Sequence, residues 1–358
     1  MLNVKEKVVV AMSGGVDSST VAALLKSQGY DIIGITLQLY DYNSSVKKGS
    51  CCAGQDIYDA KNVANQLGIS HYVLNYENKF QDAVIDDFVG SYFRGETPLP
   101  CVRCNQSVKF KDLLKFTKEI GVNTLATGHY VRKINHSDGP KLLKAIDKKK
   151  DQSYFLFATT KEQLNHLYFP LGDFNKEETR DLARNFNLPV SNKPDSQDIC
   201  FVPNGDYRKV ISDKHSDSIC SGKIIHVDGF ELGIHQGIIN YTIGQRRGLG
   251  ISYHEPLYVT KIDVDNNIIY VGPESSLQTT EFKIKDINWL DDTPLEDKKD
   301  MLMVKIRSTM APVEATLNKI DENEVLVKLL SKEKAVAPGQ ACVIYQNDQV
   351  LGGGWITR

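Results

Sequence analysis

The stretch from Ser13 to Ser18 reads Ser-Gly-Gly-Val-Asp-Ser and combines two glycines with hydroxyl and carboxylate side chains. The β-branched run Val8–Val10 predicts a buried strand before it, and Val21–Leu25 opens a predicted helix after it. A glycine turn at this junction directs backbone N–H groups toward one point, where the positive end of the helix dipole favours an anion. The stretch is therefore predicted to cradle a phosphate group. An ordinary strand–turn–helix corner with a serine cap is the alternative.

The polar groups of this turn indicate which phosphate it would hold. The turn lacks the lysine of the G-x-x-x-x-G-K-[ST] loop, which holds a γ-phosphate. The hydroxyls of Ser13, Ser18 and Ser19, with the carboxylate of Asp17, suit a pyrophosphate group and its magnesium ion. The order S-G-G-x-D-S resembles the motif of the PP-loop ATP pyrophosphatases, which implies cleavage of ATP between the α and β phosphates and transfer of AMP to an oxygen. The implied ATP contacts are Ala11, Met12, Ser13, Gly14, Gly15, Val16, Asp17 and Ser18.

Seven cysteines are the second chemical feature of the chain. Their number is odd and no secretory signal precedes them, so they indicate thiols used in chemistry rather than a disulfide framework. Cys104 and Cys200 fall in stretches predicted as polar loops with charged neighbours, where a thiolate is favoured relative to a resting pKa of about 8.5. Cys220 and Cys342 are predicted to be small buried hydrophobic residues, and Cys51-Cys52 is assigned no role.

Alternating strand and helix patterns surround the turn. Tyr30–Leu39 and His71–Tyr76 predict strands, and Asp56–Leu67 predicts an amphipathic helix between them. Such βα units build a parallel sheet with helices on both faces and place ligands beyond the carboxyl ends of the strands. Leu37 is therefore expected near the nucleotide, against the adenine. Gly128 ends a further predicted strand and is expected to bring a second stretch of backbone to the nucleotide.

The rest of the chain divides by pattern into a helical part and a β-rich part. A basic hairpin or loop is predicted over residues 131–150, and helices are predicted over 80–95, 153–167 and 176–187. The stretch 101–110 is predicted to enter a further helix that runs to Ile120. Beyond about residue 205, short alternating runs recur between turns rich in Gly, Asn and Asp. The predicted organisation is a parallel-sheet α/β domain over 1–205, a small β-rich domain over 206–276 and a barrel-like β domain over 277–358.

The composition is that of a soluble protein, and 358 residues suffice for two or three domains. No apolar run approaches the ~18 residues of a membrane span and no signal peptide is evident, so a cytoplasmic protein without a membrane partner is expected. The net charge of −2 by itself argues against a nucleic-acid partner. Residues 101–152, however, carry twelve Lys/Arg against five Asp/Glu, a local excess that suits a phosphate backbone. A solvated helix face explains three of these cations, Lys111, Lys115 and Lys118.

Three separated motifs together resemble the tRNA-specific 2-thiouridylase family. They are Ser13–Ser18, Cys104-Asn105 followed by Val108-Lys-Phe110, and Asp195-Ser-x-x-Ile-Cys200-Phe201. Further stretches typical of the family are Thr127–Tyr130, Lys150–Phe155, Tyr241–Leu249 and Pro338–Gln340. The resemblance covers nearly the whole chain and implies ATP-dependent 2-thiolation of the wobble uridine (U34) of tRNA.

The resemblance also implies a route for the sulfur. The C2 oxygen of the uridine would be adenylated with release of pyrophosphate, and a persulfide on Cys200 would then attack C2. Cys104 would attack the inner sulfur, leaving a Cys104–Cys200 disulfide, and AMP would be released. Such a bond needs Cα atoms within roughly 4.4–6.8 Å, so the loop carrying Cys200 is expected to fold over the first domain. The implied partners are tRNA and a persulfide donor protein, either a cysteine desulfurase or a relay protein.

The family pattern implies seven tRNA contacts, and a solvated surface role is the alternative for each. They are His129, Lys150, Asp151, Gln152, Arg307, Ser308 and Gln340. The wobble base must leave the anticodon stack at a cost of about a few kcal/mol, which backbone contacts spread over several domains could supply.

Cys101 stands where many family members carry an acidic residue, three positions before Cys104. The acid–base role of that carboxylate does not carry over to a thiol. Cys101 and Cys104 could form a redox pair or half a zinc site, but no second C-x-x-C or Cys/His pair completes a zinc tetrahedron. A further alternative is an iron–sulfur cluster held by Cys101, Cys104 and Cys200, with one iron open to sulfide. No residue is assigned as a metal ligand.

Two other functions are compatible with the nucleotide motif. An amidating PP-loop ligase would need a glutaminase domain or an ammonia source, and it has no use for paired cysteines. A nucleotide sensor or RNA-binding module without catalysis would release no pyrophosphate when mixed with ATP and bulk tRNA.

Overall fold

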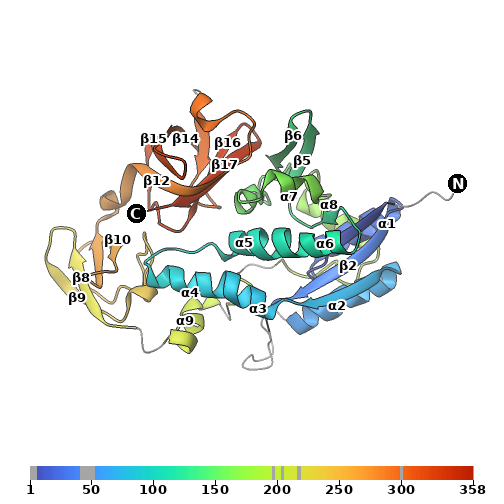
Figure 1. Cartoon of the computed structure of the whole chain (residues 1–358). Helices are drawn as coiled ribbons and strands as arrows, with labels where there is room; N and C mark the ends of the chain where they lie inside the picture. The colour runs from blue at the N-terminus through green and yellow to red at the C-terminus, as the bar shows by residue number, and fades with distance from the viewer. Residues whose placement is uncertain are drawn as a thin grey trace. The chain divides into compact units, whose positions relative to one another are not determined.

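The computed structural model describes residues 6–40, 53–195, 198–202, 205–215, 219–298 and 301–357, and Figure 1 draws its helices and strands. Cys51 and Cys52 lie outside the described residues. Contacts divide the chain into two compact units. The first comprises Met1–Val84, Cys101–Gly205 and Asp348–Val350, and the second comprises Ile85–Pro100, Asp206–Asn347 and Leu351–Arg358. This division is coarser than the three predicted domains, whose boundaries stay a prediction.

A five-stranded sheet with the order β3-β2-β1-β4-β7 forms the centre of the first unit. Its strands are β1 (Lys7–Ala11), β2 (Asp31–Gln38), β3 (Ser70–Asn75), β4 (Leu125–Ala126) and β7 (Leu167–Tyr168). Neighbouring strands run parallel, with Val9 opposite both Ile33 and Leu125. Val8, Val9 and Val10 are all buried, as expected of a central parallel strand. The predicted parallel-sheet α/β fold is confirmed.

Helices connect these strands. The longer ones are α1 (Val16–Ser27), α2 (Ala53–Leu67) and α8 (Lys176–Asn185), and α1 contacts both of the others. A capping box starts α8, because Asn175 and Glu178 each accept a hydrogen bond from the other's backbone N–H. The prediction of one helix over 153–167 is wrong. A 3₁₀ turn, η3 (Ser153–Leu156), comes first, and a separate capping box at Thr160 then starts α7 (Lys161–His166).

The segment that carries two of the cysteines is helical throughout. It consists of α5 (Pro100–Arg103), the π-helical η2 (Cys104–Leu113) and α6 (Leu114–Glu119), which Figure 1 draws as one continuous helix. The predicted helix running to Ile120 is confirmed, but the segment is already helical from Pro100. Because a π-helix pairs residue i with i+5, Cys104 and Lys109 lie on neighbouring turns of η2.

A basic hairpin completes the first unit, as predicted. Its strands are β5 (Val131–His136) and β6 (Gly139–Lys144). Leu143 of β6 pairs with Gln349, and Arg132 forms an ion pair with Asp348 at 3.2 Å. The C-terminal residues 348–350 therefore belong to this unit.

In the second unit, a four-stranded sheet has the order β10-β11-β8-β9. Its strands are β8 (Gly222–His226), β9 (Glu231–His235), β10 (Tyr258–Asp263) and β11 (Ile268–Gly272). The unit also contains α4 (Asp86–Phe93), which follows α3 (Glu77–Phe80) and the π-helical η1 (Gln81–Ile85) along the chain, and α9 (Tyr207–His215). Tyr92 of α4 stacks on Tyr207 of α9 with ring centroids 4.5 Å apart. The β-rich prediction for this region is confirmed in its strands but did not include α9.

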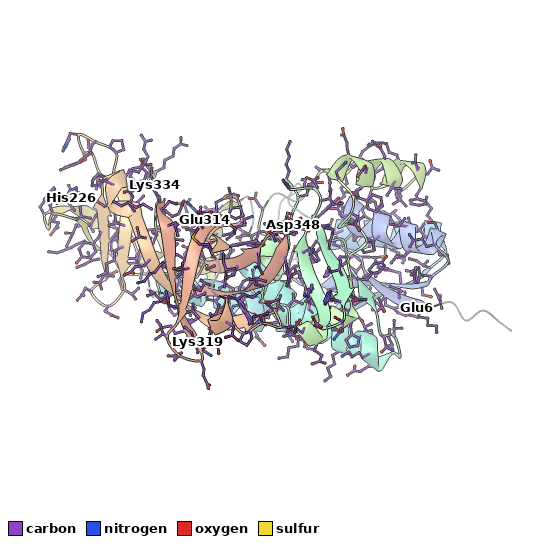
Figure 2. The ribbon with its side chains drawn as sticks, turned by 90° about the horizontal axis from the view of Figure 1, so that it is seen from above. Glu6, His226, Glu314, Lys319, Lys334 and Asp348 are labelled. Atoms are coloured by element: carbon purple, nitrogen blue, oxygen red, sulfur yellow. The ribbon has the colours of Figure 1, made fainter. Side chains whose placement is uncertain are left out.

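A closed barrel forms the rest of the second unit. Its strands are β12 (Gln278–Trp289), β13 (Leu302–Lys305), β14 (Val313–Lys319), β15 (Glu324–Lys334), β16 (Ala341–Gln346) and β17 (Gln349–Ile356). They follow the order β12-β15-β14-β13-β16-β17, and β12 pairs with β17 to close the ring. In β14, Glu314 and Thr316 are exposed, whereas Ala315 between them is buried. Glu314 and Lys319, which is exposed at the end of the strand, are labelled in Figure 2. The predicted barrel is confirmed. Among the described residues, no helix is both long and apolar enough to cross a bilayer.

Barrel closure depends on Gly352, which has φ +150° and where a Cβ atom would lie 2.3 Å from the carbonyl oxygen of Asn288. We expect Gly352→Ala to lower the free energy of unfolding of the barrel by about 1–3 kcal/mol, because the neighbouring backbone must move. Trp289 and Trp355 are the chain's two tryptophans, so urea denaturation followed by tryptophan fluorescence reports on the barrel. Gly54→Ala is the control, since a Cβ there meets nothing within 4 Å. Equal midpoints for the two variants would contradict this account of closure.

Candidate active site

The predicted phosphate cradle is a tight turn between β1 and α1. The backbone N–H of Ser13 donates to Ser18 Oγ at 3.1 Å, and the two hydroxyl oxygens lie 3.2 Å apart. Gly14 has φ +75°, and a Cβ atom there would lie 2.1 Å from the carbonyl oxygen of Asp56. Only glycine fits this position, because the turn lies directly against the backbone of α2.

A second stretch of backbone reaches the same place. At Gly128, just after β4, a Cβ atom would lie 2.9 Å from the backbone nitrogen of Ser18 and 3.1 Å from Asp17. Residues 11–18 and Gly128 are therefore close together at the N-terminus of α1, where a ligand phosphate would meet the helix dipole. Leu37 lies near the carboxyl end of β2, the strand that pairs with β1. The role of these residues in ATP binding stays a prediction.

Lys176 is a residue of this site that the sequence analysis did not identify. Its Nζ donates to both carboxylate oxygens of Asp17, at 2.7 and 2.8 Å, and lies 2.9 Å from Asp195. The hydroxyl of Tyr130 also donates to Asp17, at 2.9 Å. A capping box at the start of α8 predicts that Lys176 lies in its first turn, but no local pattern predicts its pairing with Asp17, 159 residues away.

Asp195 is the common partner of three cations. Besides Lys176 it binds Lys150 at 2.7 Å and Arg180 at 2.8 Å. Partial burial disfavours its charge, but the hydrogen bonds from Lys150 and Lys176 outweigh this and lower the pKa of Asp195 to about 2. The carboxylate is thus ionised at neutral pH and holds these cations in the same unit as the cradle.

Lys193 fixes the glycine turn itself. Its Nζ donates to the carbonyl oxygen of Gly14 at 3.0 Å, to Asp56 at 2.6 Å and to Asp59 at 2.5 Å. Burial opposes the ammonium charge, but the bonds from Asp56 and Asp59 outweigh it and raise the pKa of Lys193. The ammonium group therefore ties the turn to α2.

The carboxylate of Asp17, which was expected to suit a pyrophosphate group with its magnesium ion, is already paired with a protein cation, because both of its oxygens bind Lys176. Across the described part of the chain, no three His, Cys, Asp or Glu side chains are arranged to hold a metal ion. The residues as arranged do not fit a protein-bound magnesium ion at Asp17, and we derive no reaction step through one.

Cys104 and Cys200 both belong to the first unit. Cys104 is only 8% exposed at the start of η2. The loop carrying Cys200 is held by Tyr40, whose hydroxyl donates to the carbonyl oxygen of Cys200 at 2.9 Å, and by Phe80, whose ring lies 5.6 Å from that of Phe201. The structure records Cys104 and Cys200 as thiols rather than as a disulfide.

The expectation that these cysteines favour thiolates is wrong for this conformation. Burial raises the pKa of Cys104, and the nearby Cys101 raises it further. Although Cys200 as a residue is exposed, its thiol lies among protein atoms, so loss of hydration, then the charges of Cys104 and Cys101, raises its pKa to about 12. Cys104 lies in a helix rather than in the predicted polar loop, which explains the difference. Because the charges of Cys104 and Cys101 both raise the pKa of Cys200, the three thiols lie near one another.

Lys109 is the cation that opposes these shifts. Its charge lowers the pKa of Cys101, Cys104 and Cys200 relative to what burial alone would produce. Its Nζ donates to Asn105 Oδ1 at 3.1 Å, and the Asn105 amide donates to the carbonyl oxygen of Phe155 at 3.3 Å. The second predicted motif thus supplies both a thiol and an anchored positive charge beside it.

The four predicted tRNA contacts of the first unit are used inside the protein. The His129 imidazole bonds to Thr127, and burial followed by the charge of Lys109 lowers its pKa to about 3, so it is neutral. Asp151 accepts from the backbone N–H of Ala145, and Gln152 accepts from that of Tyr130. Lys150 binds Asp195. Each of these four side chains makes at least one hydrogen bond inside the protein in this conformation, and their contact with tRNA stays a prediction.

The three tRNA contacts predicted in the second unit have different surroundings from the four of the first unit. Arg307 and Ser308 lie in the turn after β13, and Arg307 Nε is buried with no hydrogen-bond partner among the described residues. A buried guanidinium nitrogen without a partner is costly and suits an incoming anion. The amide of Gln340 donates to the carbonyl oxygen of Thr97 at 3.1 Å.

The position of Lys109 leads to a prediction for thiol reactivity. Because Lys109→Met removes the positive charge beside the thiols, the pKa of Cys200 should rise further, and its alkylation by iodoacetamide at pH 8 should slow by roughly three- to tenfold. In the wild-type protein the rate should increase about tenfold per pH unit from pH 8 to 10, because only the thiolate reacts and the pKa is about 12. Peptide-resolved mass spectrometry measures both rates.

Lys111→Met is the matched control, since Lys111 is exposed on the same helical segment. It should leave the rate unchanged. A rate for wild-type Cys200 that reaches its plateau near pH 9 would show that this thiol is not shielded as described.

Family models match three successive parts of the chain. One described as tRNA methyl transferase HUP domain matches residues 6–204, and one described as tRNA methyl transferase PRC-barrel domain matches 209–273. One described as aminomethyltransferase beta-barrel domain matches 279–356. The first alone spans more than half of the chain.

Relatives from two Rickettsia species match almost end to end, and both are called tRNA-specific 2-thiouridylase MnmA. The protein of Rickettsia canadensis (strain McKiel) is 65% identical over 362 residues, covering 100% of this chain and 98% of its own. That of Rickettsia bellii (strain OSU 85-389) is 65% identical over 351 residues, covering 98% and 96%. A solved 4-thiouridine synthetase–RNA complex with bound ATP is 17% identical, covers 59% of this chain and 51% of its own, and has a TM-score of 0.37, too low to support an argument about function. The full-length matches show that this chain belongs to the tRNA-specific 2-thiouridylase family.

Proposed function

We propose that this protein replaces the C2 oxygen of the wobble uridine of tRNA with sulfur, in a reaction that consumes ATP and releases pyrophosphate and AMP. The observation that carries the proposal is the presence, in one compact unit, of an anion cradle at residues 11–18 and of the mutually interacting thiols Cys104 and Cys200. The first group suits oxygen activation by ATP, and the second suits sulfur transfer. A site for ATP alone would not explain the paired thiols, and paired thiols alone would not explain a site for ATP.

Activation comes first because a uracil carbonyl oxygen is a poor leaving group. The C2 oxygen attacks the α-phosphorus of ATP, pyrophosphate leaves, and the oxygen becomes part of an AMP ester. The N-terminus of α1 supplies positive charge for the phosphates, and so does the cluster in which Lys150, Lys176 and Arg180 outnumber the carboxylates of Asp17 and Asp195. Lys193 also holds the Gly14 carbonyl, which keeps the turn's N–H groups directed at the ligand.

Sulfur transfer then uses the two thiols. The terminal sulfur of a persulfide on Cys200 forms a bond to C2, and the C2–oxygen bond breaks as AMP leaves. The thiolate of Cys104 attacks Sγ of Cys200 and breaks the S–S bond, so the sulfur stays on C2 and a Cys104–Cys200 disulfide forms. A dithiol reductant then returns both residues to thiols. The persulfide is replenished by a donor protein, such as a cysteine desulfurase or a relay protein.

The thiols must lose protons during this cycle. In the structure burial raises the pKa of both, and the position where many relatives have an acid is occupied by Cys101. Lys109 stabilises a thiolate by its charge but cannot accept the proton while it is an ammonium group. The proton acceptor therefore belongs to the bound substrates or to a different arrangement of the loop.

The decisive test is mass analysis of nucleosides from tRNA incubated with ATP, magnesium, a persulfide source and the enzyme. Wild-type protein should form 2-thiouridine, whereas Cys200→Ser and Cys104→Ser should form none above the enzyme-free blank but should still release pyrophosphate when tRNA is added. Cys220→Ser is the control, since Cys220 belongs to the second unit and is exposed. The prediction of a buried residue is wrong for Cys220, whereas Cys342 is buried as predicted. Thiolated uridine from Cys200→Ser at the wild-type rate would refute the proposed sulfur route, and absence of pyrophosphate release by the wild type would indicate a binding protein.

Lys193→Gln tests the cradle. Removing the ammonium group leaves Asp56 and Asp59 facing each other and the Gly14 carbonyl without its donor. We expect a stability loss of about 1–3 kcal/mol and ATP affinity reduced by at least about tenfold. Thermal denaturation and isothermal titration with ATP measure the two effects. Lys115→Gln should change neither, because Lys115 belongs to an exposed surface pair; ATP affinity unchanged in Lys193→Gln would show that the turn does not depend on this tie.

A further inference from the structure

One sequence motif has no part in the reaction described so far. It is the stretch Tyr241-Thr-Ile-Gly-Gln-Arg-Arg-Gly-Leu249 in the second unit. Its two ends, Tyr241 and Leu249, are buried at 6% and 7% exposure, whereas Arg246 and Arg247 between them are exposed. The protein thus anchors both ends of a loop and presents two adjacent guanidinium groups at its surface.

Gln245 fixes the loop from the inside. Its side-chain oxygen accepts from the backbone N–H of Thr242 at 3.0 Å, and its side-chain nitrogen donates to the carbonyl oxygen of Arg247 at 3.0 Å. Two backbone bonds tie the loop to β10: Gly244 N–H to Val259 oxygen at 2.8 Å, and Val259 N–H to Gln245 oxygen at 3.0 Å. The backbone that carries the arginines is therefore ordered by bonds on both sides.

The glycines of the loop are required by its shape. Gly244, Gly248 and Gly250 have φ of +86°, +78° and +70°, which L side chains rarely adopt. A Cβ atom at Gly244 would also lie 2.7 Å from the Cβ of Ala335, so the loop rests closely on the β15–β16 connection. Tyr207 of α9 adds a hydrogen bond to the side chain of Thr242. A surface charge that served only solubility would not need a loop backbone fixed by so many contacts.

The charge of the loop is not compensated nearby in the sequence. No Asp or Glu occurs between Glu231 and Glu255. Within the described residues, no hydrogen bond or ion pair involves the guanidinium groups of Arg246 and Arg247, whereas Lys223 of the same unit is paired with Glu231 at 2.9 Å. Planar guanidinium groups with uncommitted donors on an ordered backbone suit bidentate binding of phosphate oxygens.

We infer that the loop 242–250 binds phosphodiester groups of the RNA backbone through Arg246 and Arg247. The inference rests on the proposed function, because tRNA is the polyanion that this protein would engage. It adds a contact outside the seven predicted tRNA residues. An acidic protein surface would offer carboxylates instead, but nothing in the described structure presents a groove or apolar surface for such a partner at this loop.

The test compares full-length wild type with the double variant Arg246→Gln/Arg247→Gln. Binding of fluorescent bulk tRNA is measured at several salt concentrations between about 50 and 200 mM. Removing one arginine–phosphate interaction should reduce the slope of log K against log [salt] by roughly 0.7–0.9, so the double variant's slope should fall by about 1.5, with affinity reduced at least about tenfold at the lowest salt. ATP affinity should stay at the wild-type value. The control Lys223→Gln removes a paired charge from the same unit and should keep the wild-type slope.

Protection from chemical modification provides a second measurement without any substitution. Saturating tRNA should protect Arg246 and Arg247 from phenylglyoxal in the wild-type protein, as read by peptide mass spectrometry. If the wild type binds and thiolates tRNA but the double variant keeps its slope, or if tRNA leaves the labelling unchanged, the loop is not an RNA contact and the proposed function stands. If the wild type neither binds nor thiolates tRNA, the proposed function itself is refuted and this inference with it.

Discussion

The geometry of the first unit depends on one bridge of charges. Lys176 binds Asp17 at the start of α1 and Asp195 near the cysteine-bearing loop at the same time. Asp195 in turn gathers Lys150 and Arg180, while Lys193 ties the glycine turn to α2. Segments far apart in the chain are thereby fixed around the cradle. The cations are assembled before any phosphate arrives, and the carboxylates offset their mutual repulsion, so an anion meets charges that need little rearrangement.

The thiols, in contrast to the cradle, are held in an unreactive form in the resting structure. Burial and mutual proximity keep Cys104 and Cys200 protonated at neutral pH, and a thiol is far less readily oxidised or alkylated than a thiolate. Lys109 lies close enough to favour the charged form but does not outweigh burial. In the proposed reaction, reactivity must therefore increase when the substrates bind, because the resting arrangement suppresses it. On the proposed route, such an arrangement would protect the sulfur carrier between turnovers.

The sequence predicted features whose causes are local. The valines of β1, the glycine turn and the helix that follows are dictated by neighbouring residues. The strand pattern ending at Gly128 predicted a second stretch of backbone at this turn, and a Cβ atom there would lie 3.1 Å from Asp17. Lys176 and Lys193 could not be predicted, because an ion pair across more than a hundred residues leaves no periodic signal. The prediction that Cys104 favours a thiolate was wrong for a related reason. Charged neighbours in the sequence suggested a polar loop, whereas the helix turns the thiol into the interior.

The residues considered as RNA contacts fall into two classes, according to whether their polar groups already bond to protein atoms. Lys150, Asp151 and Gln152 already bond to protein groups, so part of their hydrogen-bonding capacity is used inside the protein. Arg307 has a buried nitrogen with no acceptor among the described residues, and Arg246 and Arg247 present guanidinium groups for which the described residues supply no partner. A contact made by the second class gains interaction energy without breaking an internal bond. Under the proposed function, Arg246, Arg247 and Arg307 would therefore add electrostatic free energy of RNA binding without the loss of an internal bond, while Lys150 and Asp151 help to order the surroundings of the cradle.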